Sequence, residues 1–172
     1  SRIIYGARVS IGIGLIVTFL GSIGSAAIGM ISGYYGGIVD ISLQRIVDTW
    51  MAFPGLVITL TLVSVMGSGI PQLIMILTLF AIFPSSRVIR SAVLAIKENQ
   101  YIEGARAIGC SDMRILMQYV LPNIMATIIV VATIRLGMVI LIEASLSFLG
   151  FGIPPPFPTW GSMLSGNARA YM

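Results

Sequence analysis

Three long stretches of this chain contain no charged side chain, and they limit its fold more than any other feature. They cover residues 9–39, 49–86 and 115–134. A helix that crosses a membrane needs about 20 mostly apolar residues, so each stretch holds at least one span. The chain is 57% hydrophobic and 9% charged, whereas a soluble domain has roughly 25% charged residues. We therefore predict an all-α, polytopic membrane helix bundle.

The second stretch is about twice as long as one span requires. Gly67-Ser68-Gly69-Ile70-Pro71 lies in its middle, and such a cluster of glycine and proline marks a turn. We therefore expect about four transmembrane helices in this chain. They cover residues 11–31, 52–66, 71–83 and 123–142, with Pro84 near the end of the third.

Two other segments lie outside these spans. Tyr34-Tyr35-Gly36-Gly37 and the charged residues Asp40, Arg45 and Asp48 are expected to form a short polar connection before the second span. The tail at residues 151–158 contains four prolines, which exclude a continuous helix there.

Small residues recur at every fourth position of the first span. Gly21, Ser25, Gly29 and Gly33 share one face of the helix and form a narrow groove. Another helix can approach closely along such a groove. That helix is either a second span of this subunit or a span of another subunit.

Residues 87–114 differ from their surroundings, because eight of them are charged. That density is too high for the hydrocarbon layer, so the segment lies in water or against another protein. Residues 98–108 within it are expected to form a short amphipathic helix.

Tyr101, Ala105 and Ile108 fall three and four positions apart, which places them on one face of this helix. Glu103 and Arg106 lie on another face, where they can pair.

The chain is expected to turn sharply after this helix. Gly109 supplies the left-handed residue that ends it, and Ser111 or Asp112 caps a second helix that starts near Met113. Pro122 lies where the second helix meets the membrane and is a natural bend point. The result is a rigid bent lever beside the membrane.

Basic residues indicate an orientation, because cytoplasmic loops carry an excess of Lys and Arg. With residues 87–114 in the cytoplasm, the cytoplasmic loops hold Arg45, Arg87, Arg90, Lys97, Arg106 and Arg114, against Arg2, Arg8 and Arg169 outside. The turn at residues 67–71 and the proline-rich tail then face the far side. Basic residues at membrane edges also account for the net charge of +4 without a nucleic-acid partner.

Glu103-Gly104-Ala105, Gly109 and Leu121-Pro122 together resemble the EAA loop of binding-protein-dependent ABC transporter permeases. Two positions depart from that loop, since Gly104 replaces the second alanine and Tyr119 stands where isoleucine is usual. Glycine lowers helix propensity by about 1 kcal/mol, so a looser helix is expected there.

Further segments, covering essentially the whole chain, resemble the dipeptide, oligopeptide and nickel branch of that family. They are Tyr5-Gly6-Ala7-Arg8, Gly33-Tyr34-Tyr35-Gly36-Gly37 with Asp40, Ala52-Phe53-Pro54, Glu143-Ala144-Ser145-Leu146-Ser147-Phe148-Leu149-Gly150, and Pro154 to Pro156 with Trp160-Gly161.

The resemblance implies the transmembrane permease subunit of an ABC importer, a multi-pass protein of a bacterial or archaeal plasma (inner) membrane that forms a path for peptides or nickel. The implied partners are a second permease subunit, two cytoplasmic ATPase subunits that bind the Glu103 loop, and an extracytoplasmic substrate-binding protein. ATP and Mg are expected on the ATPase partners, with no cofactor on this chain. The family normally has another span at each end, so residues 1–172 are expected to be a fragment of a single permease domain.

The residues themselves exclude several kinds of catalysis. The one lysine, Lys97, is followed by Glu98 and lies in no Gly-Lys-Ser/Thr phosphate loop. With no histidine and one cysteine, Cys110, the chain lacks the residues for conventional zinc sites and histidine-based triads. We therefore expect a non-catalytic subunit that takes its energy from a partner or a gradient.

Two other functions compete with an importer. One is an ion-coupled secondary carrier or channel subunit, and the other is a structural membrane anchor. Carriers usually place acidic residues or broken helices at mid-membrane. The acids of this sequence are expected in loops or at span edges, which favours the importer.

Three single residues are notable. Arg135 lies within the fourth span, where a charge costs about 2.5–3.5 kcal/mol. It is either a translocation-path residue that meets a peptide carboxylate, or a structural pair or a side chain that reaches for the membrane edge. Glu143 lies about 12 Å farther along the helix and is expected at the outer interface. Trp160 is an interfacial anchor or a contact for the binding protein.

Overall fold

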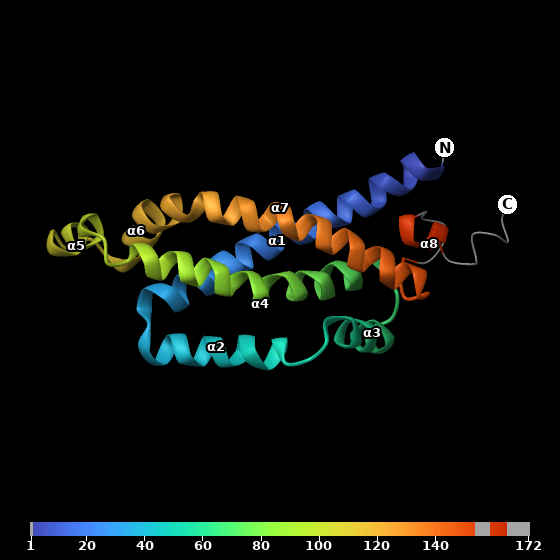
Figure 1. Cartoon of the computed structure of the whole chain (residues 1–172), viewed down its shortest axis with the longest axis horizontal. Coiled ribbons are helices and arrows are strands. Elements are labelled where there is room, and N and C mark those ends of the chain that lie inside the picture. Colours follow the sequence, from blue (N-terminus) through green and yellow to red (C-terminus); the bar gives the residue numbers. More distant parts are fainter. Residues whose placement is uncertain (1, 154–158, 165–172) are drawn as a thin grey trace. The chain divides into compact units, whose positions relative to one another are not determined.

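The computed structural model describes residues 2–153 and 159–164, and every regular element in that part of the chain is helical (Figure 1). The proline-rich part of the tail, residues 154–158, lies outside the described residues. The elements are α1 (Arg2–Tyr35), α2 (Gly37–Met51), α3 (Gly55–Met66), α4 (Ile70–Ile96), α5 (Gln100–Ala107), α6 (Asp112–Ile115), the π-helical turn η1 (Leu116–Val120), α7 (Leu121–Phe148) and α8 (Trp160–Leu164).

Three helical stretches are long and apolar enough to cross a membrane, namely Ile3–Tyr35, Ile70–Ile96 and Asp112–Phe148. A fourth span results if α2 and α3, which are bent by 83° at a short break, count as one. These three to four spans confirm the predicted all-α membrane protein. The predicted turn is also confirmed, because Gly67 ends α3 with a φ of 83°.

The helices run farther than the uncharged stretches suggested. The structure extends the first and fourth predicted spans at both ends, and α4 continues beyond Pro84 to Ile96. Proline is tolerated within a transmembrane helix when neighbouring groups take over the hydrogen bonds that it disrupts. Arg87 and Arg90 lie in the continuation, and arginine is a good helix former. Loss of hydrophobicity therefore does not mark the end of this helix.

The predicted polar connection before the second span is wrong, because residues 37–51 form α2. Gly36 and Gly37 have φ values of 64° and 53°, and α2 starts at this reversal. The inward side of α2 carries Asp40, Gln44 and Val47, whose spacing of four and three is that of a helix face.

The chain divides into two compact units. Unit 1 comprises Ser1–Gly21, Phe53–Ala81 and Thr133–Met172, and unit 2 comprises Ser22–Ala52 and Ile82–Ala132. Each unit has its own apolar core. The core of unit 1 includes Val17, Leu77, Val139 and Leu146, and the core of unit 2 includes Tyr34, Ile89, Ile102, Ile115 and Val120.

The glycine groove of α1 packs against α4 of the same chain. In unit 2, a Cβ at Gly29 would lie 2.8 Å from both the Cβ of Ile89 and the carbonyl oxygen of Ser86. In unit 1, a Cβ at Gly21 would lie 2.8 Å from the Cβ of Ala81. Distances this short admit only glycine. The groove is therefore occupied within this subunit, as one of the two interpretations predicted.

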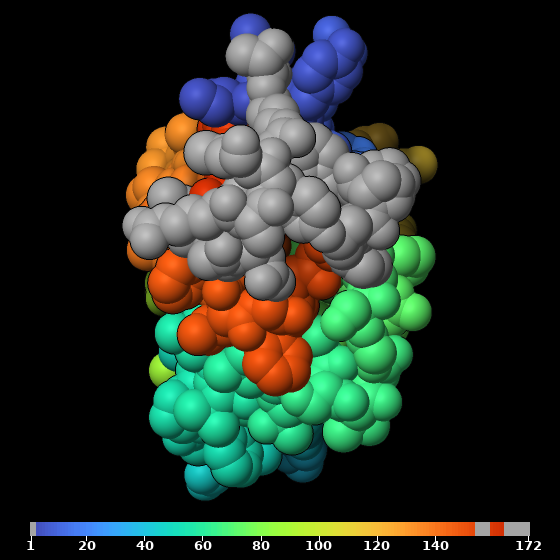
Figure 2. Space-filling model, turned by 90° about the vertical axis from the view of Figure 1, so that its right-hand side faces the viewer, coloured from blue at the N-terminus to red at the C-terminus, as the bar shows by residue number. Residues whose placement is uncertain are grey.

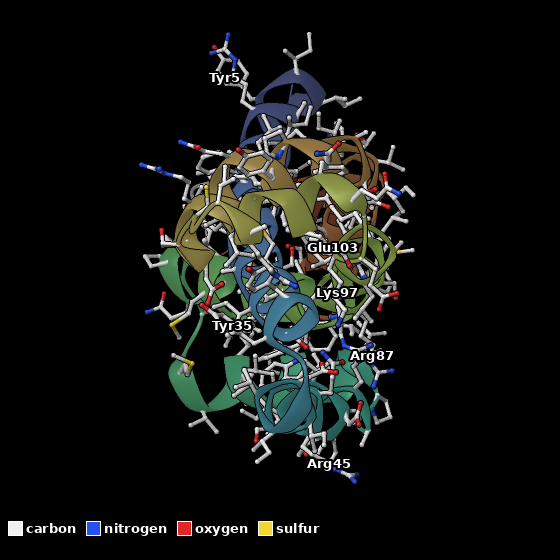
Figure 3. All side chains as sticks on the ribbon, turned by 90° about the vertical axis from the view of Figure 1, so that its left-hand side faces the viewer. Tyr5, Tyr35, Arg45, Arg87, Lys97 and Glu103 are labelled. Atoms are coloured by element: carbon white, nitrogen blue, oxygen red, sulfur yellow. The ribbon has the colours of Figure 1, made fainter. Side chains whose placement is uncertain are left out.

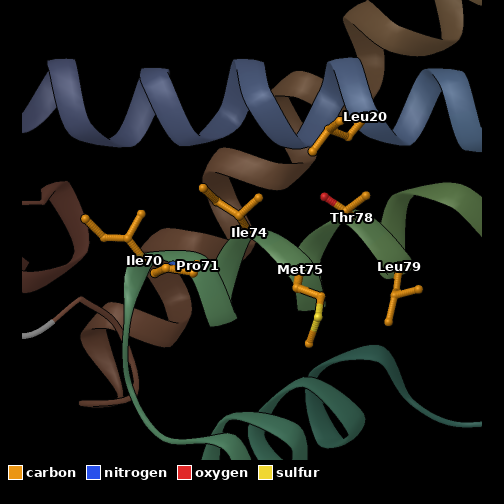
Figure 4. A pocket seen from close by; sticks show the side chains of 7 residues that line it. All are labelled: Leu20, Ile70, Pro71, Ile74, Met75, Thr78 and Leu79. Atoms are coloured by element: carbon orange, nitrogen blue, oxygen red, sulfur yellow. The ribbon is translucent and has the colours of Figure 1, made fainter.

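Unit 1 keeps large apolar side chains on its outer surface. Phe19 and Leu141 are examples, each more than half exposed. Figure 2 looks onto the end of this unit, with the first turns of α1 (blue) at the top and the end of α7 (orange) below them. A shallow apolar pocket of 490 Å³ lies between α1 and the start of α4, lined by Leu20, Ile70, Pro71, Ile74, Met75, Thr78 and Leu79 (Figure 4). Lipid chains suit such a surface, because they need no polar partner.

Candidate functional site

The corner between α5 and α6, in unit 2, contains most of the predicted site residues. Gly109 has a φ of 79°, its amide donates to the Arg106 carbonyl (2.9 Å), and the Cys110 amide donates to the Ala105 carbonyl (3.0 Å). This pair of bonds is a Schellman motif, which closes a helix on a left-handed residue. A Cβ at Gly109 would meet nothing within 4 Å. The prediction that Gly109 ends the helix is therefore confirmed, and its backbone conformation is what requires glycine.

The start of the second helix differs from the prediction in one respect. Ser111 is at the N-cap position and α6 begins at Asp112, yet neither side chain makes a capping bond. The Asp112 carboxylate instead accepts a hydrogen bond from the Tyr34 hydroxyl (2.8 Å). Asp112, one of the two residues expected to cap α6, thus ties the corner to α1.

The inward face of α5 is also different from the predicted one. Of the predicted residues Tyr101, Ala105 and Ile108, Ala105 is buried at 4% exposure, whereas Tyr101 and Ile108 are 40% and 78% exposed. Ile102, which was not predicted to face inward, is 0% exposed. Both sets fit the spacing of a helix face. The choice between them is made by the core of unit 2, into which Ile102 and Ala105 pack together with Ile115.

Glu103 and Arg106 do not form the predicted pair. In the described part of the chain the recorded ion pairs are Arg87 with Asp48 and Arg90 with Asp40. Arg106 places its guanidinium 5.0 Å from the centre of the Tyr34 ring, a cation–π contact. Glu103 is exposed on the outer side of α5 (Figure 3).

The structure therefore gives α5 two distinct faces. Ala105 points into the core of unit 2, and Leu121 packs against the same core. Glu103, Gly104 and Gly109 are exposed at the corner. An exposed acid on a short helix whose other face is fixed is suited to contact another macromolecule.

Pro122 lies in the second position of α7, directly after the π-helical turn of residues 116–120. The Leu121 amide donates to the Leu116 carbonyl, one residue farther back than in an α-helix. Proline has no N–H, and its ring collides with the carbonyl four residues earlier in a regular helix. The wider turn relieves that crowding, so the helix continues through Pro122 to residue 148.

The two ion pairs that hold α2 against α4 were missed from the sequence. Arg90 Nε donates to Asp40 at 2.6 Å, the Ser32 hydroxyl also donates to Asp40, and Arg87 pairs with Asp48. The spacing of the two aspartates could have indicated these pairs. Asp40 and Asp48 lie about two helical turns apart, so both can face one neighbouring helix. In the sequence, Arg87 and Arg90 indicated only the orientation of the chain in the membrane.

Arg135 lies in unit 1, on α7, and belongs to a different part of the chain from the α5–α6 corner. Its side chain is partly buried, and Nη1 lies 3.9 Å from the Sδ atom of Met138 on the same helix. A role in a translocation path stays a prediction.

Glu143 was expected at the outer interface, and its depth in the membrane stays a prediction. Its side chain is fully buried, with 0% exposure. The Ser10 hydroxyl donates to one carboxyl oxygen (3.0 Å) and the Ser147 hydroxyl to the other (2.8 Å). Trp160 contacts α1 in the same unit, where its indole N–H donates to the Ile3 carbonyl (3.3 Å).

In the part of the chain that the structure describes, no group of three or more His, Cys, Asp or Glu side chains is placed to hold a metal ion.

Comparison with known proteins identifies the family. Residues 25–172 match the family of the "Binding-protein-dependent transport system inner membrane component". The whole chain is 39% identical to a glutathione transport system permease protein, GsiD, of Pectobacterium atrosepticum. It is 42% identical to the GsiD protein of Escherichia coli O6:K15:H31. The chain spans 57% and 56% of the lengths of these two relatives.

Solved structures agree on the fold. The chain is similar to a chain in inward-facing structures of the MetNI methionine ABC transporter, from a native and a selenomethionine-soaked crystal form. The TM-scores are 0.74 and 0.73 at 19% and 21% identity, covering 98% of this chain and 87% and 80% of those chains. Because the family model matches most of the sequence, this chain belongs to the binding-protein-dependent transport system inner membrane components, a family of non-catalytic, multi-pass membrane subunits.

Proposed function

We propose that this chain forms part of the translocation path of an ABC importer and receives the movement of cytoplasmic ATPase subunits through α5. In this proposal residues 1–172 act within one permease domain. The supporting observation is the α5–α6 corner, where a Schellman turn at Gly109 and a buried Ile102–Ala105 face hold Glu103 outward. A force applied to the exposed side of α5 reaches α1 through Tyr34 and α7 through Leu121.

The proposed cargo is a peptide. The curated relatives with 39% and 42% identity are named for the transport of glutathione, itself a small peptide. Nickel is the second cargo that the resemblance to this branch implies. Arg135 is retained as a candidate for the path, because a partly buried guanidinium on α7 can meet a peptide carboxylate.

The proposed partners are a second permease subunit, two ATPase subunits that carry ATP and Mg, and an extracytoplasmic binding protein. Membership in a family of binding-protein-dependent transport components supports this assembly over an ion-coupled carrier or channel. The acid that would favour a carrier, Glu143, is buried between serine hydroxyls.

The coupling role is tested by Glu103→Ala and Gly109→Ala in the full-length transporter, reconstituted with its ATPase subunits in vesicles. We expect about a tenfold loss of glutathione uptake per ATP hydrolysed, equivalent to about 1.4 kcal/mol. Membrane insertion should be unchanged, because Glu103 and Gly109 are both exposed and neither residue belongs to a buried core.

Two variants serve as matched controls. Glu98→Ala removes an exposed acid just before α5, and Gly12→Ala, on α1, adds a methyl group where nothing lies within 4 Å. Both should keep uptake tied to ATP hydrolysis. Wild-type coupling in Glu103→Ala and Gly109→Ala would contradict the proposal, as would equal losses in the two controls.

A further inference from the structure

Unit 1 buries one carboxyl group that the proposed function leaves without a role. Glu143, on α7, is fully buried, and its two oxygens accept hydrogen bonds from Ser10 on α1 and Ser147 on α7. Neither of the ion pairs recorded for the described residues includes Glu143. A buried carboxyl group is costly unless its hydrogen bonds are satisfied, and each of the two hydroxyls offsets part of that cost.

Ser10 also connects Glu143 to the last described helix. The backbone N–H of Trp160 donates to the Ser10 oxygen over 3.5 Å, while the Ser10 hydroxyl donates to Glu143 over 3.0 Å. One hydroxyl thus accepts from α8 and donates to α7. Hydrogen bonds in such a chain polarise and strengthen one another.

Helix α8 packs tightly against both α1 and α7. A Cβ at Gly161 would lie 2.2 Å from the Ala144 carbonyl oxygen on α7, and one at Gly6 on α1 would lie 3.0 Å from the Met163 Cε. Thr159 and Ser162 exchange hydrogen bonds between their side chains and backbone amides, a reciprocal cap that fixes the start of α8. The five-residue helix is therefore held as one piece.

We propose that Glu143 is a positioning residue that, through the Ser10 hydroxyl, holds α8 as a wedge joining the first turns of α1 to the last turns of α7. This joined end moves as one block during transport, and cargo uptake depends on it. The transport half of this inference rests on the proposed function. The structural half does not.

The experiment compares two serines that each donate one hydrogen bond to Glu143. Ser10→Ala cuts the link to Trp160, whereas Ser147→Ala removes a similar buried hydroxyl and leaves that link in place. Residues 1–172 contain two tryptophans, so Trp50→Phe, together with phenylalanine at any tryptophan outside these residues, makes Trp160 the single fluorescent reporter. Emission and iodide quenching are measured on the purified full-length chain, and glutathione uptake on the assembled transporter.

We expect Ser10→Ala to shift the Trp160 emission to the red, raise its iodide quenching and lower uptake. Ser147→Ala should change none of the three. Glu143→Gln should resemble the wild type, because its amide oxygen still accepts from Ser10. Glu143→Ala should resemble Ser10→Ala.

Three outcomes would overturn the inference. They are unchanged quenching in Ser10→Ala, equal quenching in both serine variants, and a loosened Trp160 with undiminished uptake. Failure of the proposed function is distinguishable, because wild-type uptake would then not require ATP, while the Trp160 signals would still be measured without any partner.

Discussion

At the scale of single residues, Tyr34 joins the α5–α6 corner to α1. It lies near the end of α1 and is buried. Its hydroxyl donates to Asp112 at 2.8 Å, and its ring faces the Arg106 guanidinium at 5.0 Å. One side chain therefore contacts both helices of the corner.

We expect Tyr34→Phe to lower the stability of the chain by about 1 kcal/mol, the usual net value of one hydrogen bond. The ring remains, so the contact with Arg106 is kept. Thermal unfolding of the purified protein in detergent would measure the loss. The double variant Tyr34→Phe with Asp112→Ala should be less destabilised than the sum of the two single variants, because both remove the same bond.

Tyr35→Phe is the matched control. Tyr35 is the next residue, it is exposed, and the described residues supply no hydrogen bond to its hydroxyl. Its melting temperature should equal that of the wild type. A similar loss in Tyr34→Phe and Tyr35→Phe, or full additivity with Asp112→Ala, would contradict the role given to Tyr34.

At the scale of elements, the close approach of α1 to α4 is the feature most sensitive to a single methyl group. We expect Gly29→Ala to destabilise the protein by about 1–3 kcal/mol, the usual cost of forcing extra volume into a packed core. The added carbon would meet the Ile89 Cβ and the Ser86 carbonyl oxygen at 2.8 Å, and backbone does not yield easily. Thermal unfolding would show the effect as a lower melting temperature.

Gly12→Ala provides the comparison on the same helix. A Cβ at Gly12 would meet nothing within 4 Å, so the substitution removes only the flexibility of glycine. We expect it to leave stability unchanged or to raise it by about 0.5–1 kcal/mol. If the Gly29→Ala protein were as stable as the Gly12→Ala protein, this result would contradict the close contact of α1 with α4 at Gly29.

At the scale of the whole molecule, the basic residues predict which side of the membrane each turn faces. The α5–α6 corner is expected in the cytoplasm and the turn between α3 and α4 on the far side. Two exposed positions test this, Ile108 at the corner and Ser68 in the turn. In a Cys110→Ser background that also has serine at any cysteine outside residues 1–172, a cysteine introduced at each position is treated with a membrane-impermeant thiol reagent.

We expect Ser68→Cys to react in intact cells and Ile108→Cys to react only after the membrane is opened. Activity of the Cys110→Ser background is the control for folding. Reaction of Ile108→Cys in intact cells would contradict the predicted orientation. It would place α5 outside the cytoplasm, where no cytoplasmic ATPase can reach it.

The sequence by itself determined the membrane class, the turn near Gly67, the stop at Gly109 and the family. Each of these depends on local properties, such as the length of an uncharged run, a residue that tolerates positive φ, or a short motif. Such properties act over a few residues and can be read without knowledge of the partner helices.

Only the tertiary structure decided which faces are buried. Ile102 rather than Tyr101 faces the core, Asp40 and Asp48 on α2 pair with arginines of α4, and Glu143 lies inside unit 1. Helical spacing allows several faces, and the choice among them is made by side chains that are distant in the sequence. For Glu143 that side chain is Ser10, which lies 133 positions earlier and supplies a hydrogen bond that a buried carboxyl group requires.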